Sequence, residues 1–93
     1  MAEDVRIEAY FSGHVQGVGF RFTTIDVAAR FPEIGGTVRN LPDGRVEVIA
    51  EGPEERLIEF IAALGDEMGS YIRGVDKKLL AARGEFSGFR VAR

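Results

Sequence analysis

The stretch from Gly13 to Arg21 combines the residue types and spacing that best support chemistry. It reads Gly-His-Val-Gln-Gly-Val-Gly-Phe-Arg and lies between an alternating segment and a helical one. A glycine-rich loop of this kind can direct several backbone N–H groups at one point, where the following helix dipole adds positive potential. The guanidinium of Arg21 matches a phosphate or a carboxylate. The stretch predicts an anion-binding loop; the competing interpretation is a tight strand-to-helix connection whose glycines serve packing alone.

Three known nucleotide-binding motifs fit this stretch poorly. A nucleoside-triphosphate P-loop requires a lysine beside its glycines, and none is nearby. The dinucleotide fingerprint would place its third glycine at Phe22, and the chain lacks the second half of that fold. Residues 17–22 also resemble the aromatic RNA-binding signature, but that signature belongs on a central strand rather than in a loop. RNA binding therefore stays a minor alternative.

The side chains near the loop limit the reactions that it can support. The chain has no cysteine, its single histidine is His14, and no Asp or Glu occurs between residues 9 and 25. A thiolate nucleophile is excluded, and clustered metal ligands are not evident. Direct attack by water suits a substrate with a good leaving group, such as the carboxylate of a mixed anhydride. Asn40 could position that water, because its amide both donates and accepts; locally, Asn40 is better explained as the start of a turn.

Hydrophobic periodicity predicts the elements of the first half. Residues 5–12 alternate as a half-buried strand, and a helix follows from Phe20. This helix ends before Phe31-Pro32, because proline cannot continue it. Gly35-Gly36 predicts a turn, and residues 37–40 and 45–50 predict two strands joined by the turn 41–44. The apolar face expected for the helix comprises Phe22, Ile25, Ala28 and Ala29.

The second half predicts another helix and two more strands. Pro53 suits the first helical position, Glu54 and Glu55 favour the positive end of the dipole, and Gly65 is the expected C-terminal cap. Residues 71–79 indicate a weaker strand, and Phe89 and Val91 indicate a short last one. The apolar face expected for this helix comprises Leu57, Phe60, Ile61 and Leu64.

This element order predicts an α+β, ferredoxin-like βαββαβ two-layer sandwich with a short extra C-terminal strand. Two helices should cover one face of a mostly antiparallel sheet, with the first and third strands side by side in the middle. The length of 93 residues predicts a single domain, residues 1–93.

Composition excludes several classes of protein. The chain is 45% hydrophobic and carries a net charge of −3, with 12 basic and 15 acidic residues. This balance excludes a disordered or membrane-spanning chain and disfavours a nucleic-acid module. The N-terminus lacks the apolar segment of a signal peptide, so we expect a cytoplasmic protein.

Two blocks of the sequence resemble the signatures of the acylphosphatase family: residues 13–21, and residues 36–47, which read Gly-Thr-Val-Arg-Asn-Leu-Pro-Asp-Gly-Arg-Val-Glu. The resemblance implies a ferredoxin-like fold and hydrolysis of acyl phosphates to a carboxylate and inorganic phosphate. It implies that Asn40 orients the attacking water and that neither metal nor cofactor takes part. The residues that it implies for phosphoryl binding, through loop amides and one guanidinium, are Val15, Gln16, Gly17, Val18, Gly19, Phe20 and Arg21.

The resemblance also sets expectations for partners. We expect a small-molecule acyl phosphate as substrate, phosphate as product or inhibitor, no nucleic-acid or membrane partner, and a monomer. A non-catalytic anion-binding module of the same fold is the alternative. The chain departs from the family pattern where Phe31-Pro32-Glu33 replaces the usual helix-ending glycine, and where Met68-Gly69-Ser70-Tyr71 precedes the fourth strand. The limits of that strand therefore stay open, and His14 receives no role.

Overall fold

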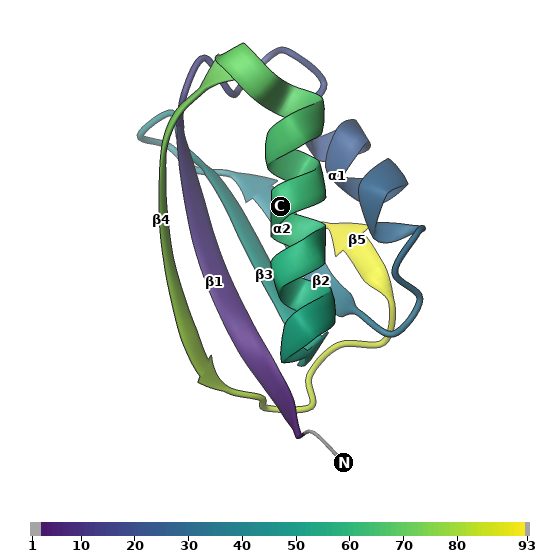
Figure 1. The fold of residues 1–93 in the computed structure, drawn as a ribbon. Coiled ribbons are helices and arrows are strands. Elements are labelled where there is room, and N and C mark those ends of the chain that lie inside the picture. The colour runs from purple at the N-terminus through teal and green to yellow at the C-terminus, as the bar shows by residue number, and fades with distance from the viewer. Residues whose placement is uncertain (1–2, 93) are drawn as a thin grey trace.

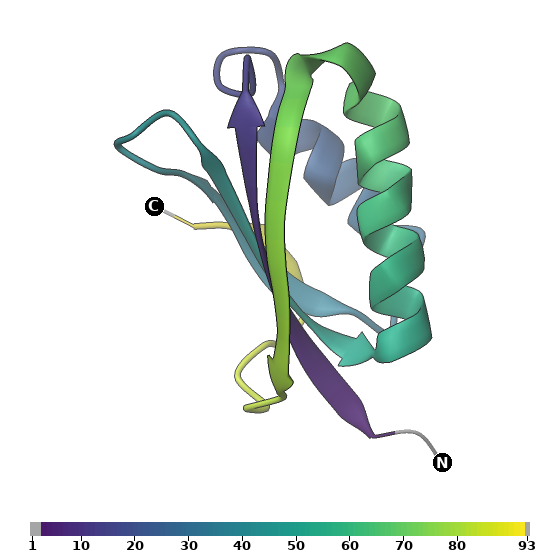
Figure 2. The same cartoon turned by 60° about the vertical axis from the view of Figure 1, so that its left-hand side comes forward.

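The computed structural model describes residues 3–92 and shows two layers, a sheet and a pair of helices. Both helices lie on one face of the sheet, and the other face is open (Figures 1 and 2). The predicted ferredoxin-like architecture is confirmed. In chain order the elements are β1 (Asp4–Gly13), α1 (Phe20–Ala28), β2 (Gly35–Asn40), β3 (Val46–Pro53), α2 (Glu54–Met68), a short 3-10 helix (Gly69–Tyr71), β4 (Ile72–Ala81) and β5 (Phe89–Val91).

The strand order of the sheet is β4-β1-β3-β2-β5, so the first and third strands lie side by side in the middle as predicted. Every pairing is antiparallel except that between β2 and β5. Because β1 and β2 both run antiparallel to β3, they finish at the same end of the sheet. We call this the loop end, since the loop after β1 and the turn after β2 both leave the sheet there (Figure 2).

Alternation along β1 divides its side chains between the two faces of the sheet. Ile7, Ala9 and Phe11 are buried beneath the helices, as the period-two pattern predicts. The predicted face of α2 is confirmed in full, and its members are Leu57, Phe60, Ile61 and Leu64. Burying a side chain of this size stabilises the fold by about 1.5–3 kcal/mol, so these two rows hold the layers together.

The predicted apolar face of α1 is confirmed for Ala28, which is buried, and for Ile25, which packs against the core, but it is wrong for Phe22 and Ala29, which are exposed. Phe22 is 75% exposed, and the buried residues are Phe20, Thr24, Val27 and Ala28. The ring of Phe20 packs on Phe11 with 5.1 Å between centroids, which fixes the rotation of the helix about its axis. The helix stops at Ala28, as the following proline requires.

The turn predicted at Gly35-Gly36 is also wrong, because both glycines belong to β2 and pair with β3. A Cβ atom on Gly36 would lie 2.1 Å from the carbonyl oxygen of Ile49 and 2.7 Å from the Phe89 ring. Gly36 is therefore needed for close packing rather than for a turn. The chain turns earlier, at residues 32–33.

The limits of α2 and β4 differ from those expected. Pro53 is the N-cap of α2 in extended conformation, rather than its first helical residue. Gly65 lies inside the helix, which continues to the buried Met68 and ends at Gly69 with a φ of 49°. Tyr71 belongs to the 3-10 helix, so β4 begins one residue later than predicted and extends to Ala81.

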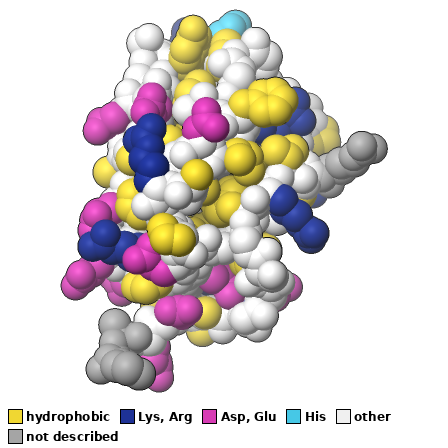
Figure 3. Space-filling view, turned by 90° about the vertical axis from the view of Figure 1, so that its right-hand side faces the viewer, with side chains coloured by type: hydrophobic (Ala, Val, Ile, Leu, Met, Phe, Trp, Pro, Cys, Tyr) yellow, Lys and Arg dark blue, Asp and Glu magenta, His cyan; other side chains and the backbone are white. Residues whose placement is uncertain are grey.

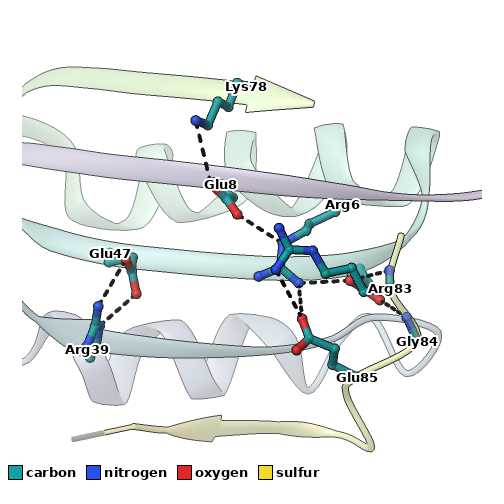
Figure 4. A network of polar contacts seen from close by, with 9 residues as sticks. Arg6, Glu8, Arg39, Glu47, Lys78, Arg83, Gly84 and Glu85 are labelled. Carbon is teal, nitrogen blue, oxygen red and sulfur yellow. Dashed lines mark hydrogen bonds and ion pairs between the residues drawn. The ribbon is translucent and has the colours of Figure 1, made fainter. Parts of the chain in front are cut away.

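Ion pairs cover the open face of the sheet. Arg6 is only 5% exposed and donates to three carboxylates, those of Glu8, Glu51 and Glu85 (Figure 4). Arg39 of β2 pairs with Glu47 of β3, with 2.7 Å between Nε and Oε1. This network joins β1 and β3 to the segment between β4 and β5.

Hydrophobic side chains gather on the side of the molecule that carries α1 and β5, as Figure 3 shows. A shallow groove there is lined in part by Ile25, Phe31, Ile34 and Phe89. Among residues 3–92, no helix is long and apolar enough to span a membrane.

Candidate active site

The loop between β1 and α1 is tied to the turn between β2 and β3 by one side chain. The amide Nε2 of Gln16 donates to the carbonyl oxygens of Leu41, at 2.8 Å, and Arg45, at 3.0 Å. The turn itself is closed by the bond from the Leu41 N–H to the Arg45 carbonyl, with Gly44 at a φ of 96°. The predicted hairpin is thus confirmed, and the loop is held against the strand end that carries Asn40.

Most backbone N–H groups of the loop have no hydrogen-bond acceptor among the described residues. The His14 N–H donates to the Tyr71 carbonyl at 2.9 Å, but between Val15 and Arg21 no backbone N–H has a protein acceptor among residues 3–92. Gly17 and Gly19 both adopt a φ of 78°, which allows the chain to turn back sharply. A run of N–H groups without protein acceptors is what an anion-binding loop requires.

Two side chains anchor this loop to the core. Val15 is fully buried, and Phe20 packs on Phe11 as the first residue of α1. The N-cap of α1 is Gly19, and no side chain caps the helix. The positive end of the helix dipole therefore lies at the loop with its N–H groups free of protein acceptors.

Arg21 lies in the first turn of α1 with its side chain exposed. Within the described part of the chain, no carboxylate lies within ion-pairing distance of its guanidinium. By contrast, Arg39 pairs with Glu47, and Arg45 pairs with Asp43 at 2.8 Å. Arg21 therefore adds a positive charge to the helix end that follows the loop, with no counter-charge from residues 3–92.

Asn40 is the last residue of β2 and is half-buried. Side chains alternate along a strand, so Asn40 shares the helix-covered face with Gly36 and the buried Val38. Its partner on β3 is Val46, which is fully buried. The carboxamide thus lies on the same side of the sheet as α1, at the end where the loop is attached.

Neighbouring charges shift two pKa values on the hairpin and the open face. Burial, followed by the charges of Glu47 and Glu8, raises the pKa of Tyr10. The backbone N–H and the guanidinium of Arg45 hold the pKa of Asp43 below its usual value. Both effects keep these side chains in one protonation state near neutral pH, so neither is suited to proton transfer there.

The residues at the loop end offer little to a metal ion. Among residues 3–92, no three His, Asp or Glu side chains gather in a way that could hold one. The groups that the loop end does carry are backbone N–H groups, the Arg21 guanidinium and the Asn40 carboxamide. The N–H groups and the guanidinium are donors only, so they suit an anion rather than a cation.

The contact made by the Gln16 side chain is not predicted from the sequence. The sequence predicts a role for the Gln16 backbone amide, whereas its side chain binds a single turn, at Leu41 and Arg45, which lie 25 and 29 residues further along the chain. No local signal reveals this, because the acceptors are backbone carbonyls of a distant turn. A long amide side chain inside a glycine-rich loop is the only hint.

Comparison with known proteins agrees with this geometry. Residues 7–91 match the acylphosphatase family. An acylphosphatase from Acidothermus cellulolyticus is 46% identical over 96 residues, which covers 97% of this chain and 89% of that protein. One from Streptomyces coelicolor is 43% identical, covering 98% of this chain and 99% of that protein.

A solved structure adds the same result for the fold. The crystal structure of acylphosphatase from Bacillus subtilis superimposes with a TM-score of 0.86 at 30% sequence identity, covering 96% of this chain and 99% of that one. The match therefore extends over both helices and the whole sheet. The chain belongs to the acylphosphatase family.

Proposed function

We propose that this protein hydrolyses the carboxyl–phosphate bond of acyl phosphates by direct attack of a positioned water. One observation carries the proposal: within the part of the chain that the structure describes, the backbone N–H groups from Val15 to Arg21 have no acceptors, and the Arg21 guanidinium has no acidic partner. The membership of the family supports the same reaction. The products are a carboxylate and inorganic phosphate.

Phosphoryl transfer depends mainly on placing the reactants and neutralising charge. The loop amides and the guanidinium of Arg21 bind the oxygens of the phosphoryl group. Charge that develops on these oxygens in the transition state meets donors already in place, which is the most effective form of electrostatic catalysis. The bond between phosphorus and the acyl oxygen breaks, and the carboxylate leaves with the bonding electrons.

Asn40 supplies the second role. Its carboxamide oxygen accepts a hydrogen bond from the attacking water and so orients it. The water oxygen forms the new bond to phosphorus and keeps one of its protons. The other proton of the water passes to another oxygen of the phosphate product. The bond from Gln16 to the β2–β3 turn supports this role, because it holds the loop against the strand that ends at Asn40.

The available side chains favour a reaction without a metal or cofactor. The chain has no cysteine and one histidine, and no metal-binding group of side chains is found among residues 3–92. A carboxylate is a good enough leaving group to need neither a covalent intermediate nor a Lewis acid. We further expect a monomer in the cytoplasm that acts on a small-molecule substrate.

The direct test is release of carboxylate from benzoyl phosphate, followed by ultraviolet absorbance in buffer containing EDTA. We expect turnover well above the buffer rate, with competitive inhibition by inorganic phosphate. Arg90→Ala is the control, because Arg90 is exposed and pairs with Thr37 of β2, whose side chain lies on the opposite face of the sheet from Asn40. Turnover that requires added metal would disprove the metal-free reaction. Phosphate binding without turnover would identify a non-catalytic anion-binding module.

A further inference from the structure

A surface hollow of about 380 Å³ lies at the loop end and is lined by Ser12, Gly13, His14 and Arg73. Its lining offers a hydroxyl, an imidazole and a guanidinium, and includes no carboxylate. His14 directly precedes Val15, the first residue of the anion-binding loop, so their Cα atoms are about 3.8 Å apart. The hollow therefore borders the proposed phosphoryl site, on a chain whose net charge is −3.

A β-bulge places Arg73 in this hollow. Ser12 pairs with Gly74, but the next residue, Gly13, pairs with Ile72, so Arg73 has no partner residue on β1. A bulge bends its strand and redirects the side chain of the extra residue, and bulges are common beside active sites. The position of Arg73 thus follows from an interruption of the ladder rather than from regular alternation.

Neighbouring residues constrain the positions of Arg73 and His14. Gly13 has a φ of 121°, and a Cβ atom there would lie 2.5 Å from the Tyr71 carbonyl oxygen and 2.7 Å from the Arg73 nitrogen. Only glycine allows the two chains to approach this closely. The imidazole of His14 stacks on the ring of Tyr71, with 6.1 Å between centroids and 29° between planes.

The guanidinium of Arg73 has no counter-charge within the described part of the chain. Among residues 3–92, no carboxylate lies within ion-pairing distance of it. On the same strand, Lys78 approaches Glu8 at 3.9 Å. At the loop end, Arg73 therefore stands beside the His14 imidazole, and both can donate to an anion, whereas the Ser12 hydroxyl donates to the Gly74 carbonyl oxygen at 3.4 Å.

We propose that Arg73 and His14 form a subsite that selects acyl phosphates whose acyl group carries a second anionic group. The inference rests on the proposed function and names a substrate class for the same site. When the phosphoryl group binds the loop, the acyl group can extend past His14 into the hollow, where the second anion meets the guanidinium. Because the hollow is open to water, the preference should be modest and should weaken with salt.

The test compares two substrates of nearly identical shape, 4-carboxybenzoyl phosphate and 4-carbamoylbenzoyl phosphate, which differ in the charge of the remote group. We expect kcat/KM to favour the carboxylate by about fivefold at low salt, since exposed charge pairs contribute little more than this. Arg73→Gln should reduce the ratio to about one, His14→Gln should reduce it partly, and Arg73→Lys should retain most of it. Arg90→Gln is the matched control and should leave it unchanged.

The outcomes separate this inference from the proposed function. The subsite would be overturned if the ratio of the two kcat/KM values were one in the unmodified protein, or if Arg73→Gln had the same ratio as the unmodified protein. Hydrolysis of both compounds would still support the proposed function. If Arg73→Gln leaves the ratio unchanged but weakens inhibition by inorganic phosphate, the hollow binds free phosphate and the subsite is likewise disproved. Hydrolysis of neither compound would refute the proposed function and the subsite with it.

Discussion

The two ends of the sheet carry the same kinds of hydrogen-bond donor, backbone N–H groups and a guanidinium, but within residues 3–92 they differ in whether a carboxylate accepts from them. Away from the loop end, the N–H groups of Arg83 and Gly84 and the Arg6 guanidinium all donate to the carboxylate of Glu51, each at 2.9 Å (Figure 4). At the loop end, the backbone N–H groups from Val15 to Arg21 and the Arg21 guanidinium have no carboxylate partner among residues 3–92. The first arrangement completes a structural contact, and the second is the one that we propose to bind a phosphoryl group.

The pKa of Glu51 shows what such a set of donors does to an anion. Burial, with only 7% of the residue exposed, opposes ionisation, but the N–H of Arg83, the guanidinium of Arg6 and the N–H of Gly84 outweigh it. The pKa of Glu51 is therefore lowered. Donors of the same type around a phosphoryl group should likewise stabilise its negative charge.

The largest expected effect is that of Arg21→Ala. Loss of this guanidinium should lower kcat/KM for benzoyl phosphate by about a thousandfold, or about 4 kcal/mol of transition-state stabilisation, as for a lost oxyanion donor or arginine finger. Inhibition by phosphate should weaken as well. Because Arg21 is exposed and without an acidic partner, the free energy of unfolding should change by less than about 0.5 kcal/mol. Enzyme kinetics and urea denaturation provide the two measurements.

Arg6→Ala is the matched substitution at the other end. It leaves the buried carboxylate of Glu51 without its guanidinium, so it should destabilise the protein strongly while kcat of the folded fraction stays the same. If Arg21→Ala instead lost stability, or Arg6→Ala lost turnover with its stability intact, the contrast between the two ends would be wrong.

Asn40→Ala should have the next largest effect. Without the carboxamide the water is poorly oriented, and we expect kcat to fall by about a hundredfold. The inhibition constant of phosphate should change by less than about threefold, because the loop donors remain. Asn40→Asp is the informative second variant, since its negative charge should also repel the phosphoryl group. Equal losses in kcat and in phosphate affinity for Asn40→Ala would place Asn40 among the binding residues instead.

Glu51→Gln tests the structural end directly. Replacing a buried, hydrogen-bonded carboxylate by an amide should lower the free energy of unfolding by about 2 kcal/mol at neutral pH. Because the folded-state pKa is depressed, the stabilisation by Glu51 is present above the unfolded pKa of about 4.3 and is lost as pH falls through the folded value. The difference between the two proteins should therefore narrow in acid.

Glu67→Gln provides the control for this measurement. Glu67 pairs with Arg30 at 2.8 Å, but both side chains are exposed, so its loss should cost less than about 0.5 kcal/mol. The donors around Glu51 would contribute little to stability if Glu51→Gln lowered the free energy of unfolding by no more than Glu67→Gln does. The same would follow if the difference in the free energy of unfolding between Glu51→Gln and the unmodified protein stayed constant down to pH 3.

Local sequence patterns predicted the elements but not the contacts between distant ones. The alternation of β1, the face of α2 and the turn at residues 41–44 each depend on neighbours in sequence, and each is confirmed. Phe22 was predicted to belong to the core because, in a short helix, helical spacing alone does not determine which face packs against the sheet. Gly36 was predicted to be a turn residue because the groups that leave no room for a side chain there, the Ile49 carbonyl and the Phe89 ring, lie far along the chain.

The same limit applies to the functional end. The glycines, Arg21 and Asn40 were identified from motifs, but the contact that brings loop and turn together joins Gln16 to carbonyls that carry no side-chain signal. The bulge that isolates Arg73 depends on the register between β1 and β4, which sequence alone does not specify. Sequence thus predicted which groups could react, and topology supplied their arrangement.

Gln16→Ala should give the smallest effect, and it tests whether the loop must be held in place. The loop loses two hydrogen bonds to the β2–β3 turn, so the free energy of unfolding should fall by about 1 kcal/mol. The amides and Arg21 remain, but their average position relative to Asn40 becomes less defined. We expect kcat/KM to fall about tenfold, since small displacements of reacting groups are costly.

A comparison with Gln16→Glu separates positioning from packing. Glutamate has the same length but cannot donate to the two carbonyls, and its charge would lie within the anion-binding loop. It should therefore weaken phosphate inhibition in addition to lowering kcat, whereas Gln16→Ala should lower kcat alone. If Gln16→Ala retained full activity, the loop would keep its shape through Val15 and Phe20, and the tie to the turn would be structural only.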